Sequence, residues 1–495
     1  GDKYCGSNII KMAELQRPMN FKHVIKGCRQ EYLNFLQSHS EHQWAIANLG
    51  NRLPSVLSVE AFYIDLLKYD EPTLVGAAME KHTEIAFEAI IRYFTRAGFR
   101  QGEIEFEWDV NRVVADMNKD AAMGACYHGK KKDWFESLTE DELVDAHKES
   151  LFKMLQGKHG IWTGSLKAEL RPELKVTQKK TRVFTAAPID VLLGAKSLVD
   201  NFNHKFYETH LQGPWTVGIN KFNQGWNRLA NSFRHEWNFL DADGSRFDSS
   251  LSPFLFAIIV RVRKYFMEQD KLGFELLDSL YTQIVFTLIS TVDGNIVRKH
   301  KGNNSGQPST VVDNTIALMF VVEYARSVCS ERFGKEMRFT FVANGDDLLI
   351  NGPDDELQII QENFTELFSH LGLNYKFEDK KNSITEVDYM SCQFMKRGDM
   401  YIPKLSKGRI LSIMEWERNE DVAAQISALN AARIEAWGYD DVYKLADDFI
   451  KYFAEQRMLK EYFYIPESFI EALYMKPANY MNLLMGALNE AVYFQ

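Results

Sequence analysis

The spacing of hydrophobic residues predicts helices towards both ends of the chain and strands between them. Residues 56–68 and 74–97 carry apolar side chains at helical intervals, and loops rich in charge separate them. After Pro403 the helical spacing continues almost to the C-terminus. We therefore expect an α+β fold, in which helices surround a small central antiparallel sheet and a helical lobe follows it.

Residues 237–254 predict the first strand of that sheet and the helix after it. Residues 237–243 (WNFLDAD) are typical of a short strand that ends in carboxylates. Ser252 and Pro253 follow, and they predict a helix start because serine caps a helix and proline fits its first turn. The apolar spacing predicts that this helix buries Phe254, Ile258, Val262 and Tyr265.

A second segment predicts a hairpin. Residues 338–342 and 348–350 are apolar, and the turn sequence NGDD between them places Asp346 and Asp347 on the turn. Before this hairpin, the loop 301–306 leads into a helical stretch that ends near Gly334. No internal repeat or low-complexity segment interrupts this order.

Composition narrows the class of protein. Hydrophobic residues make up 45% and charged residues 25% of the 495 positions, which is ordinary for a globular protein with two to four domain-sized units or one multi-lobed fold. No apolar run reaches the length of a membrane span, and the first thirty or so residues show no secretory signal. The five cysteines are scattered without a CxxC pair, so we expect a reducing compartment and neither a disulfide framework nor a structural zinc site.

Charge is distributed unevenly along the chain. The net charge of −10 argues against a general nucleic-acid binder, but an enclosed substrate responds to local charge. Residues 166–182 contain six cations and two anions, which is a net charge of +4 in an acidic protein. Lys130, Lys131 and Lys132 form a second basic group. Either segment could also be an ordinary solvated face.

Four aspartates form the strongest chemical signal. Asp243 and Asp248 are five positions apart on a strand-to-turn segment, and Asp346 and Asp347 lie on the predicted hairpin. Two-metal phosphoryl transfer needs carboxylates from separate elements to converge on cations about 4 Å apart. Oxygen ligands of this kind suit Mg²⁺.

Three motifs in order resemble those of the RNA-dependent RNA polymerases of positive-strand RNA viruses. The segment DGSRFDSS from Asp243 resembles motif A, SGQPSTVVDNT from Ser305 resembles motif B, and GDD from Gly345 resembles motif C. The strings GNNSGQPSTVVDNT and NGDDLL are most similar to the nuclear inclusion b polymerases of the potyvirus family, over about residues 110–440. The resemblance implies a closed right hand with fingers, palm and thumb.

The resemblance also implies roles for individual residues. Asp243 and Asp346 would bind two Mg²⁺ ions with help from Asp347, and Mn²⁺ could substitute for Mg²⁺. The other substrate-binding residues of motifs A and B would be Asp248, Ser305, Gly306, Thr310 and Asn314. Of these, Asp248, Thr310 and Asn314 would recognise the 2′-OH of the incoming nucleotide, since an unmatched polar site rejects a substrate that lacks the hydroxyl. Helix capping or surface polarity is the alternative for Thr310 and Asn314.

Further segments resemble motifs around the nucleotide channel. Residues 167–182 are similar to motif F, in which Arg182, Lys175 and Lys167 would bind the triphosphate and Glu169 would orient the cations.

Residues 116–124 resemble motif G, the loop by which template enters, although an ordinary lysine-rich turn remains the alternative. Residues 377–381 correspond to motif D, whose lysine protonates the leaving pyrophosphate. Lys380 is the better positional match and the adjacent Lys381 stays open. Residues 390–393 would be the primer grip, with Cys392 packed rather than reactive.

Domain limits and partners follow from the same likeness. We expect fingers in 1–200, palm with motif A in 201–254, a fingers insertion in 255–300, palm with motifs B to E in 301–405, and thumb and tail in 406–495.

The implied partners are RNA template and nascent strand, ribonucleoside triphosphates, a genome-linked viral protein as primer, the viral protease, and host translation and chaperone factors. The implied location is the infected cell's cytoplasm at membrane-associated replication complexes, with traffic to the nucleus as an addition. The terminal sequence VYFQ and Gly1 would be cut edges of a polyprotein.

Two other functions stay open on the sequence. A two-metal nuclease also needs clustered carboxylates, but it needs neither the basic segment nor a 2′-OH network. A catalytically dispensable scaffold that recruits host factors is an alternative of another class, and intact aspartates argue against it.

Overall fold

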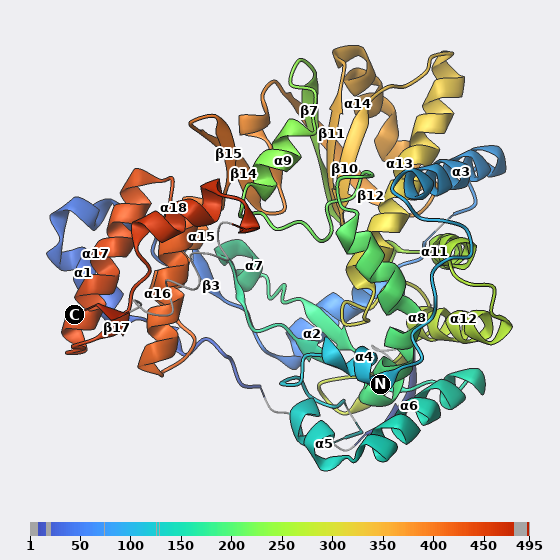
Figure 1. Ribbon diagram of the computed structural model, residues 1–495, viewed down its shortest axis with the longest axis horizontal. Helices are drawn as coiled ribbons and strands as arrows, with labels where there is room; N and C mark the ends of the chain where they lie inside the picture. The colour runs from blue at the N-terminus through green and yellow to red at the C-terminus, as the bar shows by residue number, and fades with distance from the viewer. Residues whose placement is uncertain are drawn as a thin grey trace.

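The computed structural model describes residues 8–15, 21–73, 75–124, 126–127, 129–479 and 493–494. A four-stranded sheet flanked by helices lies at the top of the view, a helical lobe stands at the left, and a larger mixed lobe lies below (Figure 1). The expected α+β class is confirmed. None of the described helices combines the length and apolar character needed to cross a membrane. Gly1, Val492 and Gln495 lie outside the described residues.

The central sheet is antiparallel throughout and has the order β10-β11-β7-β12. Its strands are β10 (Thr340–Asn344), β11 (Asp347–Gly352), β7 (Asn238–Ser245) and β12 (Asn374–Lys381). Both predicted strands and the predicted hairpin are therefore confirmed. Helices α13 (Thr310–Phe333) and α14 (Asp354–Ser369) cover one face of this sheet.

Successive side chains of β7 point to opposite faces of the central sheet. Leu240 and Ala242 belong to the main hydrophobic core, which they share with α13 and α14. Phe239 belongs to a different cluster on the other face, together with Trp226 and Phe394. Because strand side chains alternate, Asp241 and Asp243 point to the same face as Phe239. The fold thus carries its carboxylates on the face away from α13 and α14.

The two predicted helix boundaries in this region are correct. Helix α11 (Pro253–Phe266) begins with Pro253, and the Ser252 hydroxyl accepts a hydrogen bond from the Leu255 N–H at 3.3 Å. Ile258 and Val262 are buried as predicted, whereas Phe254 and Tyr265 are only half-buried. Helix α13 ends at Gly334, whose φ of 58° is the left-handed conformation that ends a helix.

Helix α13 is the central helix of the main core. Apolar side chains surround it along its length, and residues 316–322 are all fully buried. It packs against α3 (Glu80–Arg96), α11 and α14. A helix that is apolar all round must be enclosed by other elements. The N-terminus of α13, which carries the motif B residues, is therefore held in place by the core.

The lower lobe contains a five-stranded mixed sheet of order β1-β9-β8-β4-β6. Its strands are β1 (Ile9–Glu14), β9 (Asn295–Lys299), β8 (Leu288–Ser290), β4 (Ile161–Leu166) and β6 (Val183–Ala186). The surrounding helices are α2 (Val59–Leu66), η3 (Leu67–Asp70), α4 (Val110–Ala115), α5 (Lys131–Ser137), α6 (Glu140–Leu155), α8 (Ile189–Glu208) and α12 (Lys271–Val285). This sheet brings residues 161–186 next to residues 288–299, which lead into motif B.

The C-terminal lobe is helical, as expected. It contains α15 (Lys407–Glu415), α16 (Val422–Ala436), α17 (Asp440–Gln456), α18 (Glu467–Met475), and the short strands β16 (Trp416–Glu417), β17 (Tyr462–Phe463) and β18 (Tyr493–Phe494). Between it and the central sheet lie α9 (Gly225–Asn231), η4 (Ile384–Glu386), β13 (Asp388–Tyr389), β14 (Cys392–Arg397) and β15 (Met400–Lys404).

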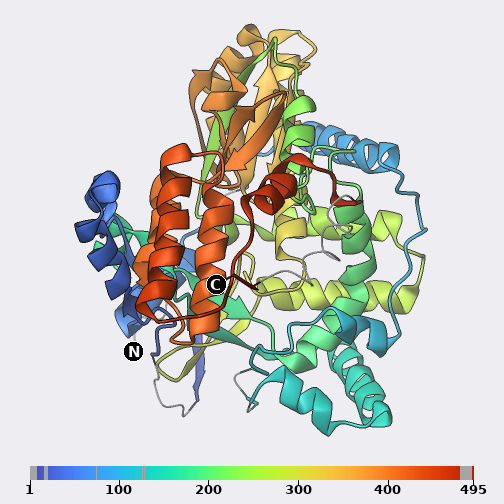
Figure 2. The ribbon, with the colours of Figure 1, turned by 60° about the vertical axis from the view of Figure 1, so that its left-hand side comes forward.

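An N-terminal segment joins the two lobes. Helices α1 (Gln30–Ser38) and η2 (Ser40–Asn48) share a hydrophobic cluster with α15, α16 and α17, and Figures 1 and 2 show them against the outer side of that lobe. Strand β2 (Gly27–Cys28) pairs with β16, and β3 (Arg52–Pro54) pairs with β5 (Leu170–Pro172) in the lower lobe. This bridge closes the molecule into a ring. The domain limits proposed from the sequence stay a prediction, and the main core contains residues from 86 to 377.

Candidate active site

The carboxylates of motifs A and C meet on the face of the central sheet that points away from α13 and α14. Asp347 pairs with Asn344 across the β10–β11 hairpin, and Asp346 lies on its turn after Gly345, whose φ is +60°. Strand β7 pairs Ala242 with Leu348, so continuing that register by one residue brings Asp243 opposite Asp347. The register brings Asp243 and Asp347 together, and the charges of Asp346 and Asp243 both act on Asp347, which supports the predicted convergence of the three aspartates.

Burial and the charge of neighbouring carboxylates raise the pKa values of Asp346 and Asp347. The pKa of Asp347 is raised to about 6, first by burial and then by the charge of Asp346. Burial, followed by the charge of Asp248, raises the pKa of Asp346, while Arg182 acts in the opposite direction. Among the described residues, no Lys, Arg or His lies within salt-bridge distance of Asp243, Asp346 or Asp347. Their negative charge is thus not neutralised by a direct ion pair in the described part of the chain.

A fourth carboxylate, Asp241, belongs to the same group and was not predicted. It lies two residues before Asp243 on the same face of β7, and burial raises its pKa to about 6. Its buried Oδ1 has no hydrogen-bond partner among the described residues. A cavity of about 300 Å³ is lined by Asp241, Asp243 and Asp347. The sequence could have indicated Asp241, because a spacing of two residues along a strand places Asp241 and Asp243 on the same face.

The donor set fits Mg²⁺. All four groups are hard oxygen donors, and a cation would favour the charged forms of Asp241, Asp346 and Asp347, which burial now penalises. In the described part of the chain, only Glu41, His42 and Asp448 place three ligand atoms within 4.8 Å of one another. The carboxylates of the sheet are therefore spaced more widely than a closed protein cage, as expected when water and substrate phosphates complete the ion's shell.

Asp248 lies on α10 (Phe247–Ser250), directly after β7, and Asn314 is its partner as predicted. The Asn314 Nδ2 donates a hydrogen bond of 2.8 Å to Asp248 Oδ1. Burial raises the pKa of Asp248, and the Asn314 hydrogen bond opposes that shift. Among the described residues, only Asn314 forms a side-chain hydrogen bond with this carboxylate.

Thr310 contacts its own loop instead of Asp248. Its hydroxyl lies 2.7 Å from the carbonyl oxygen of Asn304 and 2.9 Å from that of Gln307, and it donates to these acceptors. These contacts are not a helix cap, because a capping side chain accepts from backbone N–H groups and the N-cap residue here is Ser309. Asn314, in contrast, reaches Asp248. One helix face therefore serves two purposes: Thr310 closes the loop and Asn314 extends into the site.

Ser305 and Gly306 attach the motif B loop to the strand that follows the basic segment. The Gly306 N–H donates to the Thr185 carbonyl at 2.9 Å, and the Ser305 hydroxyl accepts from the Thr185 N–H at 3.2 Å. A Cβ on Gly306 would lie 2.5 Å from the Thr185 oxygen, so only glycine permits this approach. The contact fixes motif B relative to motif F.

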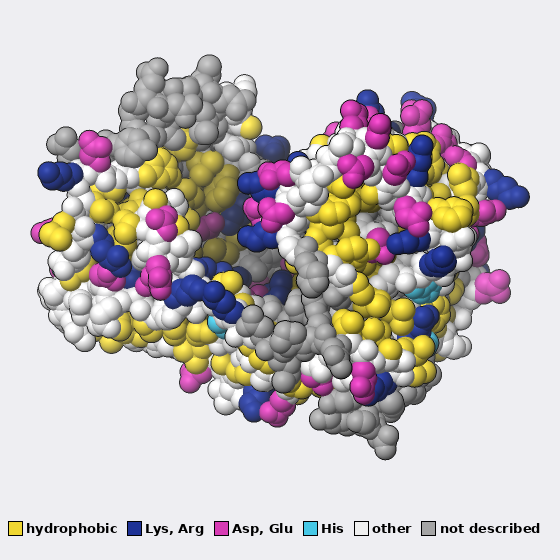
Figure 3. Space-filling model, turned by 90° about the horizontal axis from the view of Figure 1, so that it is seen from below, with side chains coloured by type: hydrophobic (Ala, Val, Ile, Leu, Met, Phe, Trp, Pro, Cys, Tyr) yellow, Lys and Arg dark blue, Asp and Glu magenta, His cyan; other side chains and the backbone are white. Residues whose placement is uncertain are grey.

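The basic segment contains β5 and the short helix α7 (Glu173–Thr177), and β6 follows it. Arg182 donates two hydrogen bonds to Glu169, at 2.7 Å from Nε and 2.6 Å from Nη2, as the sequence predicted for the orienting role of Glu169. Lys167 and Lys175 are exposed. Seen from below, the protein surface is hollowed near the centre of this face, and Lys and Arg side chains gather beside the hollow (Figure 3). The segment therefore offers free cations and one oriented guanidinium.

The two candidate lysines of motif D point in different directions. The register of β12 against β7 shifts between Phe377 and Lys380, which is a β-bulge. After the bulge Lys380 lies opposite Leu240, and its Nζ forms an ion pair with Asp354 of α14 at 3.2 Å. Lys381 lies opposite Phe239 and lines the cavity of the carboxylates. The contacts thus favour Lys381 over Lys380, because the bulge reverses the alternation of side chains.

Cys392 and Lys131, in the remaining predicted segments, have structural contacts, while the template-entry and primer-grip roles of these segments stay predictions. Cys392 is buried in the cluster of Trp226 and Phe394, so its predicted packing role is confirmed. Lys131 is buried, and its Nζ donates to the Ala122 carbonyl at 2.9 Å, which ties the 116–124 loop together. Lys130 and Lys132 are exposed.

The chain is similar to known viral proteins over most of its length. A profile described as viral RNA-dependent RNA polymerase matches residues 39–454. The genome polyprotein of Brome streak virus (strain German) is 46% identical over 449 residues, which cover 90% of this chain and 48% of the polyprotein. That of Sweet potato mild mottle virus (isolate Salazar) is 46% identical over 464 residues, covering 93% of this chain and 13% of the polyprotein. The chain thus spans less than half the length of these relatives.

The fold also matches a solved structure. The Sicinivirus 3Dpol RNA dependent RNA polymerase superposes with a TM-score of 0.72 and covers 97% of this chain and 99% of its own. The two sequences are 15% identical, so this likeness concerns the fold.

Proposed function

The chain belongs to the viral RNA-dependent RNA polymerases, with potyvirus-family polyproteins as its relatives, and from that premise we propose that it copies RNA by two-metal nucleotidyl transfer. The observation that carries this proposal is the convergence of Asp243, Asp346 and Asp347, two of them with raised pKa values and all without a cationic partner among the described residues. When bound, two Mg²⁺ ions would activate the primer hydroxyl and stabilise charge on the leaving phosphates. Asp243 and Asp346 would hold them, with Asp347 assisting.

Arg182 would bind the triphosphate of the incoming nucleotide. Glu169 holds its guanidinium by two hydrogen bonds, which fixes the plane of the fork while leaving Nη1 free of that partner. An oriented fork loses less entropy on binding phosphate than a free side chain. The side chain is 55% exposed, so a ligand can reach it. Lys167 and Lys175 would add exposed positive charge around the phosphates.

Asp248 would accept a hydrogen bond from the 2′-OH. Its carboxylate is held at one oxygen by Asn314, which supports an oriented acceptor at the ribose. A 2′-deoxynucleotide would leave that buried acceptor unsatisfied, and the resulting penalty would be the basis of selection.

A lysine of β12 would complete the reaction by protonation. As the 3′-oxygen forms its bond to the α-phosphorus, the bond to the β-phosphate oxygen breaks and pyrophosphate departs with extra negative charge. Lys381 lines the cavity of the carboxylates and would donate a proton to that oxygen, whereas Lys380 is paired with Asp354.

The direct test is incorporation by the purified chain. Ribonucleotide addition to an RNA primer on an RNA template should require Mg²⁺ or Mn²⁺ and should be lost in Asp346→Ala with the fold intact. Cleavage of the RNA without extension would instead support the nuclease alternative. No chemistry in either assay, for a folded protein, would support the scaffold.

Partners and location extend the proposal. We propose RNA and ribonucleoside triphosphates as substrates, a genome-linked viral protein as primer, and the viral protease and host translation and chaperone factors as associates. The place of action would be cytoplasmic membrane-associated replication complexes, with nuclear traffic in addition. Comparing incorporation with and without a uridylylated protein primer tests the first of these partners.

A further inference from the structure

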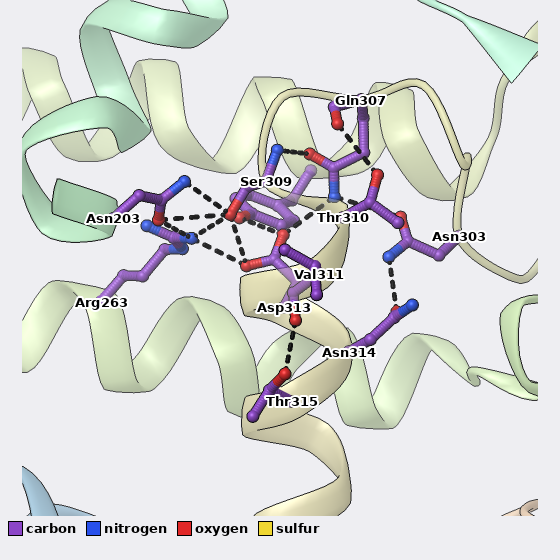
Figure 4. Close-up of polar contacts among 11 residues, drawn as sticks. Asn203, Arg263, Asn303, Gln307, Ser309, Thr310, Val311, Asp313, Asn314 and Thr315 are labelled. Carbon is purple, nitrogen blue, oxygen red and sulfur yellow. Dashed lines mark hydrogen bonds and ion pairs between the residues drawn. The ribbon is translucent and has the colours of Figure 1, made fainter. Parts of the chain in front are cut away.

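A buried polar chain leads from the core of the protein to Asp248. It begins at Arg263 of α11 and Asp313 of α13, which are both 0% exposed and are joined by a 2.8 Å ion pair (Figure 4). Asp313 Oδ2 also accepts from the Tyr281 hydroxyl at 2.7 Å and from Gln307 Nε2 at 2.9 Å. A buried carboxylate with a cation and several donors is held rigidly.

The orientation of the Gln307 amide is determined by its neighbours. The Ser309 backbone N–H donates to Gln307 Oε1 at 2.8 Å, and a backbone N–H can only donate. The Nε2 must therefore be the end that faces Asp313, and it also donates to Asn303 Oδ1 at 3.1 Å. Both ends of this amide are therefore assigned, because the backbone N–H at one end can only donate and the carboxylate at the other end can only accept.

The same reasoning fixes the next two amides. Asn303 Oδ1 accepts from Gln307 and from the Asn304 backbone N–H at 2.9 Å, so its Nδ2 faces Asn314. That Nδ2 donates to Asn314 Oδ1 at 2.8 Å. The other end of Asn314, its Nδ2, is then the one directed at Asp248. The donor direction passes from Gln307 through Asn303 to Asn314 without a break.

We infer that Asn303 and Gln307 are positioning residues for ribose selection, because they fix the Asn314 amide with its donor towards Asp248. The inference rests on the proposed role of Asp248 at the ribose. An asparagine amide free to turn over would present its oxygen to the carboxylate for part of the time, and that contact is repulsive. With its donor fixed, Asn314 occupies Asp248 Oδ1. Oδ2 has no hydrogen-bond partner in the described chain and is left for the 2′-OH.

A purely structural network would behave differently. It would anchor the loop 301–306 and the start of α13, and its loss would lower stability and overall activity alike. It would not change the preference between two nucleotides that differ at one hydroxyl. The ratio of kcat/KM for a ribonucleotide to that for its 2′-deoxy analogue isolates this preference, because the fraction of folded enzyme cancels in the ratio.

The test compares Asn303→Asp with Asn304→Asp. Both asparagines are 0% exposed and adjacent, and both changes replace an amide NH₂ by an oxygen. Asn303→Asp turns the donor that faces Asn314 into an acceptor, whereas Asn304 donates to Thr287 and lies outside the chain of amides. We expect the ratio for ATP over 2′-dATP to fall about tenfold or more in Asn303→Asp, as for one lost hydrogen bond to a charged group, and to stay within about twofold in Asn304→Asp.

A milder variant keeps the test decisive if Asn303→Asp folds poorly. Gln307→Met removes one of the two donors to Asn303 Oδ1 and leaves the Asn304 N–H, so an intermediate fall in the ratio is expected. Unchanged ratios in Asn303→Asp and Gln307→Met, beside a collapsed ratio in Asp248→Ala, would overturn the positioning role and leave the polymerase proposal intact. An unchanged ratio in Asp248→Ala would overturn ribose recognition at this carboxylate and the positioning role with it.

Discussion

Replacing Asp347 by asparagine should stabilise the metal-free protein above about pH 6 and should remove that advantage when Mg²⁺ is present. Burial, followed by the charge of Asp346, raises the pKa of Asp347 from 3.8 to about 6. The folded protein then holds this proton up to about pH 6, whereas the unfolded chain releases it near pH 4. Stability is therefore lost as pH rises through this window, because the folded state binds more protons than the unfolded state.

The size of the effect follows from the same shift. Two pKa units at ~1.4 kcal/mol each give roughly 3 kcal/mol as an upper limit. Asp347 is partly exposed, so solvent screening reduces the expected gain to about 1–2 kcal/mol for Asp347→Asn in EDTA near pH 7.5. Well below pH 4 the side chain is neutral in the folded and unfolded wild type, so the two proteins should be equally stable there. Saturating Mg²⁺ should stabilise the wild type more than the variant, since ligand binding adds to the free energy of unfolding.

Urea unfolding at both pH values, with EDTA and with Mg²⁺, measures these differences. Asp399→Asn is the matched control, because Asp399 is an exposed aspartate in the turn between β14 and β15. The control should change neither the pH dependence nor the response to Mg²⁺. The reasoning would be refuted if Asp347→Asn in EDTA were no more stable than the wild type near pH 7.5, or if Mg²⁺ stabilised both proteins equally.

Other substitutions test separate parts of the site and fold. Asp346→Ala should lower turnover at least about a thousandfold, and retention of a tenth of wild-type turnover in Mg²⁺ would refute its metal role. Arg182→Lys should raise the nucleotide KM, and Arg182→Ala should raise it more, while the salt slope of RNA affinity changes by only about one unit. Weak RNA binding with normal nucleotide kinetics would assign that residue to the RNA path instead. Lys381→Met should slow single-turnover incorporation more than Lys380→Met, and the reverse order would restore Lys380 as the proton donor. Arg29→Met should lower the free energy of unfolding by about 2–4 kcal/mol, because buried Arg29 donates to Gln425 and to two carbonyl groups of α15; an unchanged urea midpoint would contradict this.

Local sequence determined the elements and the main acids of this protein. The turn sequence NGDD, the strand before Asp243 and the Ser252-Pro253 helix start each depend on a few neighbouring residues, so their predictions hold in the structure. Asp248 and Asn314, which the resemblance assigned to one 2′-OH site, are hydrogen-bonded to each other, and Glu169 orients Arg182 as the resemblance implied. In both cases the resemblance to the family's motifs identified the residues that belong together.

Tertiary structure determined the orientation of several side chains that residue spacing does not predict. The bulge in β12 turns Lys381, and not Lys380, towards the carboxylates, and a shift of one residue leaves no mark in the composition of the segment. The Thr310 hydroxyl donates to carbonyl oxygens of its own loop, because α13 begins next to those carbonyl groups. Asn303 gains its directional contact to Asn314 only when the loop folds back over α13. Bulges, loop closure and buried amide orientation all depend on contacts between separate elements, and those contacts form only when the chain packs.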